Sequence, residues 1–364
     1  MNIRPLKIML AGGGTGGHVI PAIAIAEEVI RRGGEVRFVG TSDRIEARLV
    51  PEAGFGIDFI KVKPLAGGGM LKLISGLSYV PSAIIAAMQP VRSFAPDAVI
   101  GVGGYVAGPV VLAARLMGIP TAVLEQNATV GLANKIVSKL IRRAFVTYKS
   151  TVTAFPAGRV VISGNPVRQQ IIDTAKKPKP KAEGDLVNIL VMGGSQGALT
   201  IDDRVPAACE MAKLGGQIKV LHQCGKGREN QVEAAYSRGG VEAKAVDFIT
   251  DTAAKFLNAD LVVARAGATT VSELTVMGLP AVFLPYPHHK DKQQEKNAKP
   301  MADIGAAIII DEKTTGPREL SEAISKFVMD EEYRSAASKA SRSLGHPDAA
   351  KIVVDGLMQL KKNR

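Results

Sequence analysis

Short apolar runs alternate with stretches of helical periodicity along the whole chain. In the first half each run ends at a glycine or a polar loop, and the runs cover residues 6–11, 36–39, 98–102, 121–124, 144–147 and 160–163. Short continuous apolar runs bounded by turn residues predict strands that are buried on both faces. Their alternation with helical segments predicts an α/β fold built on doubly wound parallel sheets.

The same pattern begins again in the second half. Residues 173–185 are polar and contain proline, which predicts a surface loop or linker. After it, VNILVMGGSQGA at 187–198 repeats the strand, double glycine and helix of LKIMLAGGGTGGH at 6–18. We therefore predict two Rossmann-like domains, residues 1–165 and 166–340, that face each other across a cleft. The segment 341–364 is too short for a domain and is expected to pack back onto the first one.

Residues 261–298 carry the most informative strand and loop pattern. The apolar runs 261–264 and 281–284 predict strands, and 268–277 predicts a helix that stops at Gly278. Gly267 is expected to let a ligand approach the backbone, and a helix capped by threonine would point its free N–H groups at an anion. A carboxylate one turn further on suits the two hydroxyls of a ribose, and amides beyond the second strand suit a neutral polyhydroxyl group. These side chains are Thr269, Thr270, Glu273, Asp291, Gln293 and Gln294.

Composition narrows the class of protein and of partner. The chain has 364 residues, 46% hydrophobic, with 38 glycines and no tryptophan, which is typical of a soluble α/β protein with tight turns. Its formal net charge is +12, and residues 1–165 hold 18 Lys and Arg against 9 Asp and Glu. A basic first half suits anionic lipid or a phosphorylated substrate, whereas nucleic acid is disfavoured because no basic cluster carries interleaved aromatics.

The cysteines and the N-terminus indicate the compartment. Cys209 and Cys224 have neither metal-ligand spacing nor a disulfide framework, which favours a reducing cytoplasm. The first apolar run breaks at glycine before it reaches the length of a signal peptide, so export is not expected.

Residues 70–88 are apolar over nearly the ~20 residues that a membrane span needs. Glycine, serine and proline interrupt this segment, which makes a true span the least favoured interpretation. A partly buried helix pair is one alternative. The other is a surface helix that dips into the lipid interface, supported by Lys61, Lys63, Lys72 and Arg92.

The first glycine loop fits a dinucleotide motif only in part. Gly12, Gly14 and Gly17 satisfy G-x-G-x-x-G after a strand, but the second strand ends in Val39-Gly40-Thr41 without the expected ribose-binding acid. What remains is a nest of backbone donors with His18 on its rim, suited to a phosphate or a reacting hydroxyl. A structural glycine turn with a surface histidine is the alternative.

The second glycine loop, at 193–197, opens a helix in the same way and suggests a phosphate site. Arg168 follows Asn165-Pro166 at the predicted domain junction, where its guanidinium could pair with a diphosphate. No D-x-D sequence occurs, so a metal bridged by paired aspartates is not expected. Helix N-termini and arginine would stabilise the leaving diphosphate instead.

Taken together, the motifs resemble one known family. They are GGTGGH at 13–18, GVGGYVAGP at 101–109, LEQN at 124–127, GNPVR at 164–168, GGSQGA at 193–198, RAGATTVSE at 265–273 and HKDKQQ at 289–294. In this order they resemble the MurG family, the UDP-N-acetylglucosamine transferases that make lipid II from lipid I in bacterial peptidoglycan synthesis. The resemblance implies a GT-B fold with the acceptor on the first domain and the UDP-sugar on the second. It also implies inversion at the anomeric carbon without metal or cofactor, at the cytoplasmic face of the bacterial inner membrane.

The resemblance also assigns roles to individual residues. His18 would be the catalytic base, with Glu125 as its rival. Donor contacts would come from Thr15, Gly16, Gly17, Asn127, Arg168, Ser195, Ile249, Ala268, Thr269, Glu273, Gln293 and Gln294, with Glu273 at the ribose and the backbone near Ile249 at the uracil. Acceptor contacts would come from Gly14, Thr15, His18 and Tyr105. The chain departs from the family at Ala266, where serine is frequent, and at Leu124, where histidine is frequent.

Two other functions stay open at this point. A UDP-N-acetylglucosamine 2-epimerase would share the fold and the donor half, but it would need acid and base groups beside the sugar. A nicotinamide-dependent dehydrogenase would rest on the first glycine loop alone.

Overall fold

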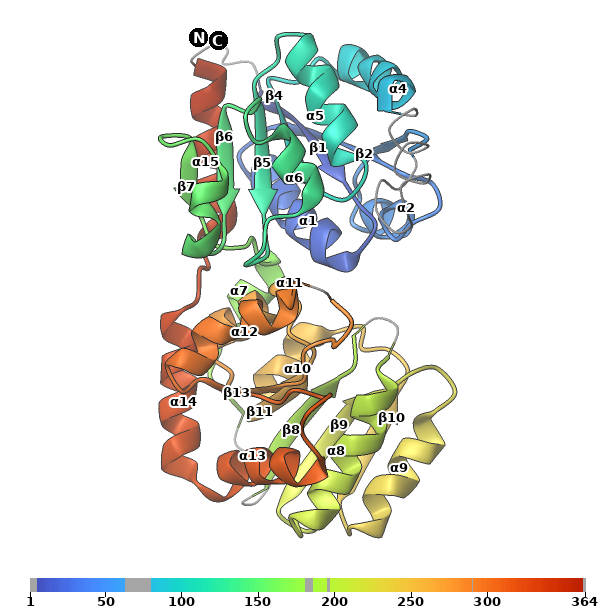
Figure 1. Cartoon of the computed structure of the whole chain (residues 1–364), viewed down its shortest axis with the longest axis vertical. Helices are drawn as coiled ribbons and strands as arrows, with labels where there is room; N and C mark the ends of the chain where they lie inside the picture. Colours follow the sequence, from blue (N-terminus) through green and yellow to red (C-terminus); the bar gives the residue numbers. More distant parts are fainter. Residues whose placement is uncertain (1–4, 63–79, 181–185, 195–196, 290, 363–364) are drawn as a thin grey trace. The chain divides into compact units, whose positions relative to one another are not determined.

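The apolar runs of the chain form two parallel β-sheets in the computed structural model (Figure 1). The structure describes residues 5–62, 80–180, 186–194, 197–289 and 291–362. The chain divides into two compact units, which are Met1–Gln169 with His346–Arg364 (unit 1) and Gln170–Gly345 (unit 2). The predicted α/β class with two doubly wound sheets is confirmed, and the predicted cleft between the domains stays a prediction.

The sheet of unit 1 has seven parallel strands in the order β3-β2-β1-β4-β5-β6-β7. They are β1 (Lys7–Gly12), β2 (Glu35–Gly40), β3 (Ile57–Phe59), β4 (Ala98–Gly103), β5 (Thr121–Glu125), β6 (Arg143–Val146) and β7 (Val160–Ile162). The six strands predicted in this half are confirmed to within one residue at each end. Strand β3 escaped prediction because its three residues, half-buried to exposed, form no apolar run.

Helices cover both faces of this sheet. They are α1 (Gly16–Arg31), α2 (Glu46–Glu52), α4 (Val80–Phe94), α5 (Ala107–Leu116), α6 (Leu132–Val137) and α15 (Ala349–Lys362), with the 3-10 helix η1 (Lys149–Ala154). Ile8 and Leu10 of β1 pack in one core cluster with α1, α2 and α15, whereas Met9 and Ala11 pack with α4, α5 and α6 on the other face. Because both faces are covered, β1 needs an apolar side chain at every one of these positions.

The last helix, α15, completes the core of unit 1, and it lies beside α1 and β6 (Figure 1). Val353, Val354 and Leu357 are fully buried in the same cluster as Ile8. A side chain at Gly356 would begin 2.5 Å from the ring of Phe145, so glycine is needed for this close approach to β6.

Unit 2 contains a six-stranded parallel sheet in the order β10-β9-β8-β11-β12-β13. The strands are β8 (Val187–Met192), β9 (Ile218–Gln223), β10 (Glu242–Val246), β11 (Leu261–Ala264), β12 (Ala281–Phe283) and β13 (Ala307–Ile309). Both strands predicted within 261–298 and the helix between them are confirmed, because β11, α11 and β12 occupy those residues.

The helices of unit 2 are α8 (Leu199–Met211), α9 (Glu229–Arg238), α10 (Thr252–Asn258), α11 (Ala268–Met277), α12 (Gln293–Asp303), α13 (Pro317–Met329) and α14 (Glu331–Ser343). Helix α7 (Gln169–Thr174) begins at the boundary of the units and occupies the start of the predicted linker. Residues 181–185 of that linker lie outside the described residues.

The order of strands places a topological switch point in each sheet. The chain winds outward in one direction from β1 and in the other from β4, and the same reversal separates β8 from β11. Ligands of open parallel sheets bind outside the carboxyl ends of the strands at such points. The loops after β1, β4, β8 and β11 are therefore where a site is expected.

The segment predicted to meet a membrane is described only in part. Helix α4 covers 80–94, and residues 63–79 lie outside the described residues. Within the described ranges, no helix has both the length and the apolar character needed to cross a bilayer.

The burial of α15 against unit 1 predicts a unit-specific loss of stability. Leu357→Ala should lower the free energy of unfolding of unit 1 by ~2–5 kcal/mol, since it leaves a cavity beneath α1. Hydrogen exchange followed by mass spectrometry in urea reads the two units separately, and peptides of unit 2 should be unaffected. Lys351→Ala, an exposed position of the same helix whose side chain pairs only with Asp348 among the described residues, is the matched control. Equal protection of β1 and β4 in both variants would contradict this role of α15.

Candidate active site

Two glycine loops of unit 1 touch each other at the switch point between β1 and β4. The N–H of Gly13 donates to the carbonyl of Gly103 at 3.3 Å. A side chain at Gly12 would begin 2.5 Å from the oxygen of Gly103, and one at Gly104 would overlap the carbonyl of Gly13. Gly12, Gly103 and Gly104 also have positive φ, so this contact between backbones depends on glycine.

His18, in the first turn of α1, is held against these loops. Its Nδ1 lies 3.1 Å from the carbonyl oxygen of Gly13 and 3.3 Å from Oγ1 of Thr15. A carbonyl only accepts hydrogen bonds, so Nδ1 must carry the proton and Nε2 is left with its lone pair. Within the described residues Nε2 has no hydrogen-bond partner. The imidazole is thus fixed in the tautomer that a general base requires.

The surroundings of His18 favour its neutral form. Burial lowers the pKa of His18, and the opposing effects of the Gly13 hydrogen bond and the negative charge of Glu46 are smaller. The other wall of its pocket is Gly103, where a side chain would begin 2.7 Å from Nε2. His18 is half-buried. The alternative of a structural glycine turn with a surface histidine stays untested.

A carboxylate that sequence reasoning missed organises the first glycine loop. Glu46, only 1% exposed, accepts from the N–H of Gly14 at 2.8 Å and from the N–H and hydroxyl of Thr41 at 3.1 and 2.8 Å. The signal that could have found it is the acid five residues after the threonine that ends the second strand.

The loop is therefore a smaller donor nest than predicted. The N–H groups of Gly13 and Gly14 are already engaged by Gly103 and Glu46. Those of Thr15 and Gly16 have no partner among the described residues, and α1 lacks a side-chain cap. An anion would therefore meet the N-terminus of α1 rather than the whole loop.

Tyr105 follows the glycine pair of the second loop. Its side chain is 44% exposed, two residues beyond Gly103. A ring in this position is accessible to a ligand that approaches the carboxyl end of β4.

Glu125, the predicted rival base, is placed differently from His18. It is 1% exposed, and its Oε2 accepts from the N–H of Gly131 and from Nδ2 of Asn134, both at 2.9 Å. Its Oε1 accepts from the N–H and Nδ2 of Asn127 at 3.1 and 3.5 Å. Burial raises the pKa of Glu125 by more than these four hydrogen bonds lower it. The carboxylate shapes the loop after β5, and this geometry disfavours Glu125 as the base.

In unit 2 the N-terminus of α11 lies at the switch point between β8 and β11. Gly267 is the N-cap residue and no side chain caps the helix, so the predicted capping by Thr269 and Thr270 is wrong. Gly267 has φ −65°, and a side chain there would meet only Oγ1 of Thr270, at 3.8 Å. Since the fold itself tolerates a side chain at this position, any requirement for glycine would have to come from a ligand.

Arg265, the first residue of the 265–273 motif, is held by the loop that follows β12 and by Glu312. Its Nη1 donates to the carbonyls of Leu284 and Pro285 at 2.8 and 3.2 Å and pairs with Glu312. Asn297 in turn donates to the carbonyl of Ala266 at 3.3 Å. Both side chains fix the backbone that leads into α11.

Glu273 lies on α11 and is 4% exposed, so it is not a solvated acid of the helix surface. Ala268 and Thr269, in the first turn of the same helix, are also buried. A carboxylate accepts hydrogen bonds from hydroxyl groups such as those of a sugar.

Gln294 is oriented by the backbone of the preceding loop. Its Oε1 accepts from the N–H of Tyr286 at 2.8 Å, so its NH₂ group is the end left to donate to a ligand. The N–H of Gln293 bonds to Asp291 at 3.3 Å. Tyr286 itself is 43% exposed beside this amide.

The second glycine loop, after β8, is held by a buried glutamine that sequence reasoning missed. Nε2 of Gln223 donates to the carbonyl of Gly194 at 3.2 Å, and the N–H of Gly193 donates to the carbonyl of Gln223 at 3.4 Å. A polar residue that ends a buried strand was the available signal. Ser195 lies outside the described residues.

The other predicted donor residues lie apart from this cluster in the sequence. Ile249 is buried in the loop between β10 and α10, and Arg168 is half-buried near the end of the first segment of unit 1. Among the described residues, no group of three His, Cys, Asp or Glu side chains is arranged to hold a metal ion, and Cys209 and Cys224 are buried free thiols.

Comparison with known proteins matches both units to one family. Residues 8–146 match the glycosyltransferase family 28 N-terminal domain and residues 188–353 its C-terminal domain. The chain is 41% identical over 362 residues to a UDP-N-acetylglucosamine–N-acetylmuramyl-(pentapeptide) pyrophosphoryl-undecaprenol N-acetylglucosamine transferase of Anaeromyxobacter dehalogenans, covering 99% of this chain and 94% of the relative. It is 43% identical over 355 residues to the protein of the same name from Glaesserella parasuis, covering 97% and 98% of the two chains.

Solved structures show the same fold. The crystal structure of Acinetobacter baumannii MurG has a TM-score of 0.80 and 32% identity, covering 98% of this chain and 100% of that one. A UDP-GlcNAc 2-epimerase from Neisseria meningitidis reaches a TM-score of 0.69 over 97% of this chain and 99% of that one, but at 13% identity it shares only the fold.

The packing of His18 on Gly103 predicts a position-specific glycine requirement. Gly103→Ala should lower the free energy of unfolding by ~1–3 kcal/mol, because its methyl group would overlap the imidazole at φ +105°. Gly108→Ala, in α5 with nothing within 4 Å of the new methyl, should be neutral or more stable by ~0.5–1 kcal/mol. Thermal unfolding of the two variants is the measurement, and equal melting temperatures would rule out the tight contact.

Proposed function

The chain belongs to the MurG family of N-acetylglucosamine transferases within glycosyltransferase family 28, and we propose that it carries out this family's reaction. It transfers N-acetylglucosamine from UDP-N-acetylglucosamine to lipid I, the N-acetylmuramyl-pentapeptide carried on pyrophosphoryl-undecaprenol, and forms lipid II. The observation that carries the proposal is the similarity to transferases of this name over both units of the GT-B fold. An epimerase is less supported, since the epimerase structures share the fold at far lower identity.

Unit 1 supplies the acceptor side in this proposal. A hydroxyl of the acceptor sugar attacks the anomeric carbon of the donor while the bond from that carbon to the UDP oxygen breaks. The hydroxyl proton passes to Nε2 of His18, whose tautomer leaves that atom as an acceptor. Tyr105 and the backbone of Gly14 and Thr15 contact the acceptor. The open N–H groups of α1 suit its diphosphate.

Unit 2 supplies the donor side. Glu273 accepts hydrogen bonds from the ribose hydroxyls, and the N-terminal N–H groups of α11, at Ala268 and Thr269, favour the negative charge of the diphosphate. Gln294 donates its NH₂ group to a sugar oxygen, with Gln293 beside it. The backbone near Ile249 contacts the uracil. The proposal also includes contacts of the donor with Ser195 and with five residues of unit 1, which are Thr15, Gly16, Gly17, Asn127 and Arg168.

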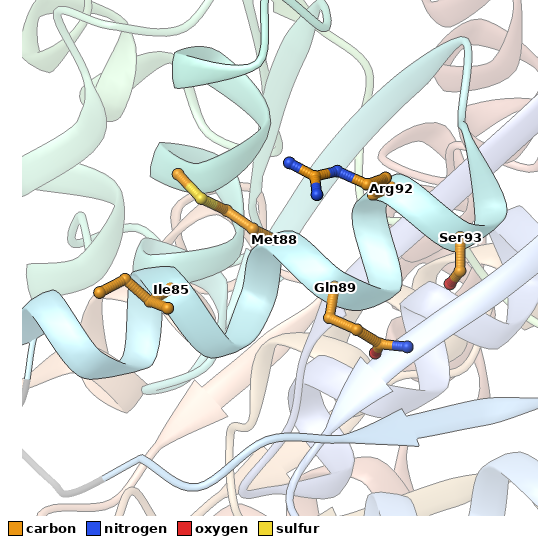
Figure 2. A pocket seen from close by; sticks show the side chains of 5 residues that line it. All are labelled: Ile85, Met88, Gln89, Arg92 and Ser93. Atoms are coloured by element: carbon orange, nitrogen blue, oxygen red, sulfur yellow. The ribbon is translucent and has the colours of Figure 1, made fainter.

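Helix α4 provides the described part of a membrane-facing surface. Its inner face, with Ala83, Ala87 and Val91, is buried in unit 1. Ile85 is 69% exposed and lines a surface pocket with Met88, Gln89, Arg92 and Ser93, which Figure 2 shows along the helix. Met88 is half-buried and also packs against the core of unit 1. An exposed isoleucine close to arginine suits the interface of an anionic bilayer, so we place the enzyme peripherally on the cytoplasmic face of the inner membrane.

Mass spectrometry of the reaction products tests the proposed function directly. The protein is incubated with UDP-N-acetylglucosamine and a short-chain analogue of lipid I. The acceptor should gain the mass of one N-acetylglucosamine residue, with release of UDP. An epimerase would instead convert the donor into an isomer of the same mass without using the acceptor. An unchanged acceptor would end the transferase proposal.

The donor role of Glu273 predicts a loss of UDP affinity. Glu273→Ala should weaken UDP binding by ~1.5–3 kcal/mol, about tenfold or more, because a charged acceptor is removed from buried hydroxyls. Calorimetric titration measures it, and Glu332→Ala, an exposed acid of α14, is the control. Unchanged affinity in the first variant would exclude the ribose assignment.

The base role of His18 predicts a defined pH dependence. Burial lowers the pKa of His18, so the acidic limb of kcat should lie below pH 6.5, where Nε2 becomes protonated as the pH falls through the lowered value. His18→Ala should reduce kcat by ~10²–10⁴-fold and remove this limb while UDP affinity persists. A raised acceptor KM with an intact kcat and limb would show instead that His18 holds phosphate.

The membrane proposal predicts salt-sensitive binding. Sedimentation with anionic vesicles should decrease as salt rises, since each basic residue near the surface contributes ~1 kcal/mol that salt screens. Ile85→Glu should weaken binding about tenfold, because ~1.5 kcal/mol of apolar burial is lost. Ile30→Glu, exposed on α1 in the opposite layer of unit 1, is the control. Vesicle binding that changes neither with salt concentration nor in Ile85→Glu would exclude this surface as the membrane contact.

A further inference from the structure

We infer that Glu46 is a positioning residue for the transfer reaction, acting on His18 through the peptide bond between Gly13 and Gly14. The inference rests on the proposed role of His18 as the base. Glu46 makes no hydrogen bond to the imidazole, and the contacts between the two side chains run through the peptide that lies between them.

The two ends of one peptide unit make the two contacts. The N–H of Gly14 donates to Oε2 of Glu46 at 2.8 Å, and the C=O of Gly13 accepts from Nδ1 of His18 at 3.1 Å. Because the peptide is planar and trans, its N–H and C=O point in opposite directions. A carboxylate on one side therefore turns the carbonyl toward the imidazole on the other.

The carboxylate is itself held rigidly. Oε1 of Glu46 accepts from both the N–H and the hydroxyl of Thr41, at 3.1 and 2.8 Å, which anchors it to the end of β2. A side chain at Gly13 would overlap the carboxylate, and one at Gly40 would begin 2.7 Å from its Cγ. Glu46 is 1% exposed, so the glycine loop lies directly on a desolvated negative charge.

This charge selects the orientation of the peptide. A flipped peptide would aim the carbonyl of Gly13 at the carboxylate, where two acceptors repel each other. It would also present the N–H of Gly14 to Nδ1 of His18, which would then have to accept. The proton would move to Nε2, and the atom that faces a substrate would no longer be a base. Glycine at positions 13 and 14 allows the peptide to flip, since Gly14 already has φ +90°. The orientation of the peptide therefore depends on the side chain of Glu46.

The carboxylate also strengthens the bond that it orients. A hydrogen bond from Gly14 to an anion polarises the peptide and makes the Gly13 oxygen a better acceptor for the imidazole N–H. The negative charge of Glu46 also raises the pKa of His18, although burial has the larger effect and lowers it.

Glu46→Gln separates charge from size. The amide has nearly the shape of the carboxylate, but its NH₂ group can donate to the Gly13 carbonyl and so permits the flipped peptide. Nitrogen NMR of the imidazole, assigned by the signal lost in His18→Gln, should show Nδ1–H in the native protein and Nε2–H in Glu46→Gln. Glu52→Gln, an exposed acid at the other end of α2, should keep the native tautomer. This measurement needs no substrate, so it does not depend on the identity of the reaction.

Kinetics provide the second readout. Glu46→Gln should lower kcat at least tenfold and leave UDP affinity within twofold. In a His18→Ala background the same change should alter kcat by less than twofold, because the group through which Glu46 acts is gone. Multiplicative losses, or a native tautomer with unchanged kcat, would overturn the inference. If the native enzyme shows no transfer, the proposed function fails while the tautomer result still stands.

A charge-preserving variant covers the case in which Glu46→Gln does not fold. Glu46→Asp keeps the negative charge next to the Gly13–Gly14 peptide and should keep Nδ1–H on His18. A switch to Nε2–H in Glu46→Asp would overturn the inference, because the charge would then not be what orients the peptide.

Discussion

The candidate chemistry of unit 1 depends on the contact between two backbones at the carboxyl ends of β1 and β4. Gly12, Gly103 and Gly104 bring the loops so close that no side chain fits between them. The space left beside Gly103 is filled by the imidazole of His18. Because a packed wall and a carbonyl hold the ring from two sides, its orientation needs no bound ligand. An imidazole that is already oriented before substrate binds does not have to reorient during the reaction, which lowers the barrier to proton transfer.

Buried amides hold the loops at both switch points. Nε2 of Gln126 donates to the carbonyl of Val102 at 2.7 Å at the end of β4, and Nε2 of Gln223 donates to the carbonyl of Gly194 after β8. Asn297 does the same for Ala266 before α11. A loop that must stay open to a ligand cannot be fixed by apolar packing on its outer side, so hydrogen bonds from beneath fix it.

Three carboxylates near the glycine loops and α11 are buried to a similar extent but lie in different surroundings. Glu125 uses both oxygens to shape its own loop, and Glu46 uses both to join β2 to the glycine loop. Burial of a charge is expensive unless it is hydrogen-bonded, so each carboxylate makes its neighbouring N–H groups obligatory. Glu273 is the third buried carboxylate, and it lies on α11 in the proposed donor site.

The sequence by itself determined the strands of unit 1 except β3, the strands β8, β11 and β12 of unit 2, and the loops that follow them. Strands β9, β10 and β13 were not predicted from the sequence. Apolar runs such as 98–102 and 261–264 predict strands that are buried on both faces, and glycine occurs in the turns that follow them. A three-residue strand such as β3 has no such signature.

The roles of single polar residues were decided only by the tertiary structure. Glu125 ends β5 and His18 lies shortly after β1. Glu125 is enclosed by four N–H donors, whereas Nε2 of His18 has no hydrogen-bond partner among the described residues. Arg265 lies within a family motif but binds carbonyls of the next strand's loop, while Glu46 lies outside every motif and contacts the glycine loop. Spacing along the chain shows which side chains reach the carboxyl edge of a sheet. Which donor each one meets there depends on neighbours from distant parts of the chain, and only the folded arrangement brings those neighbours together.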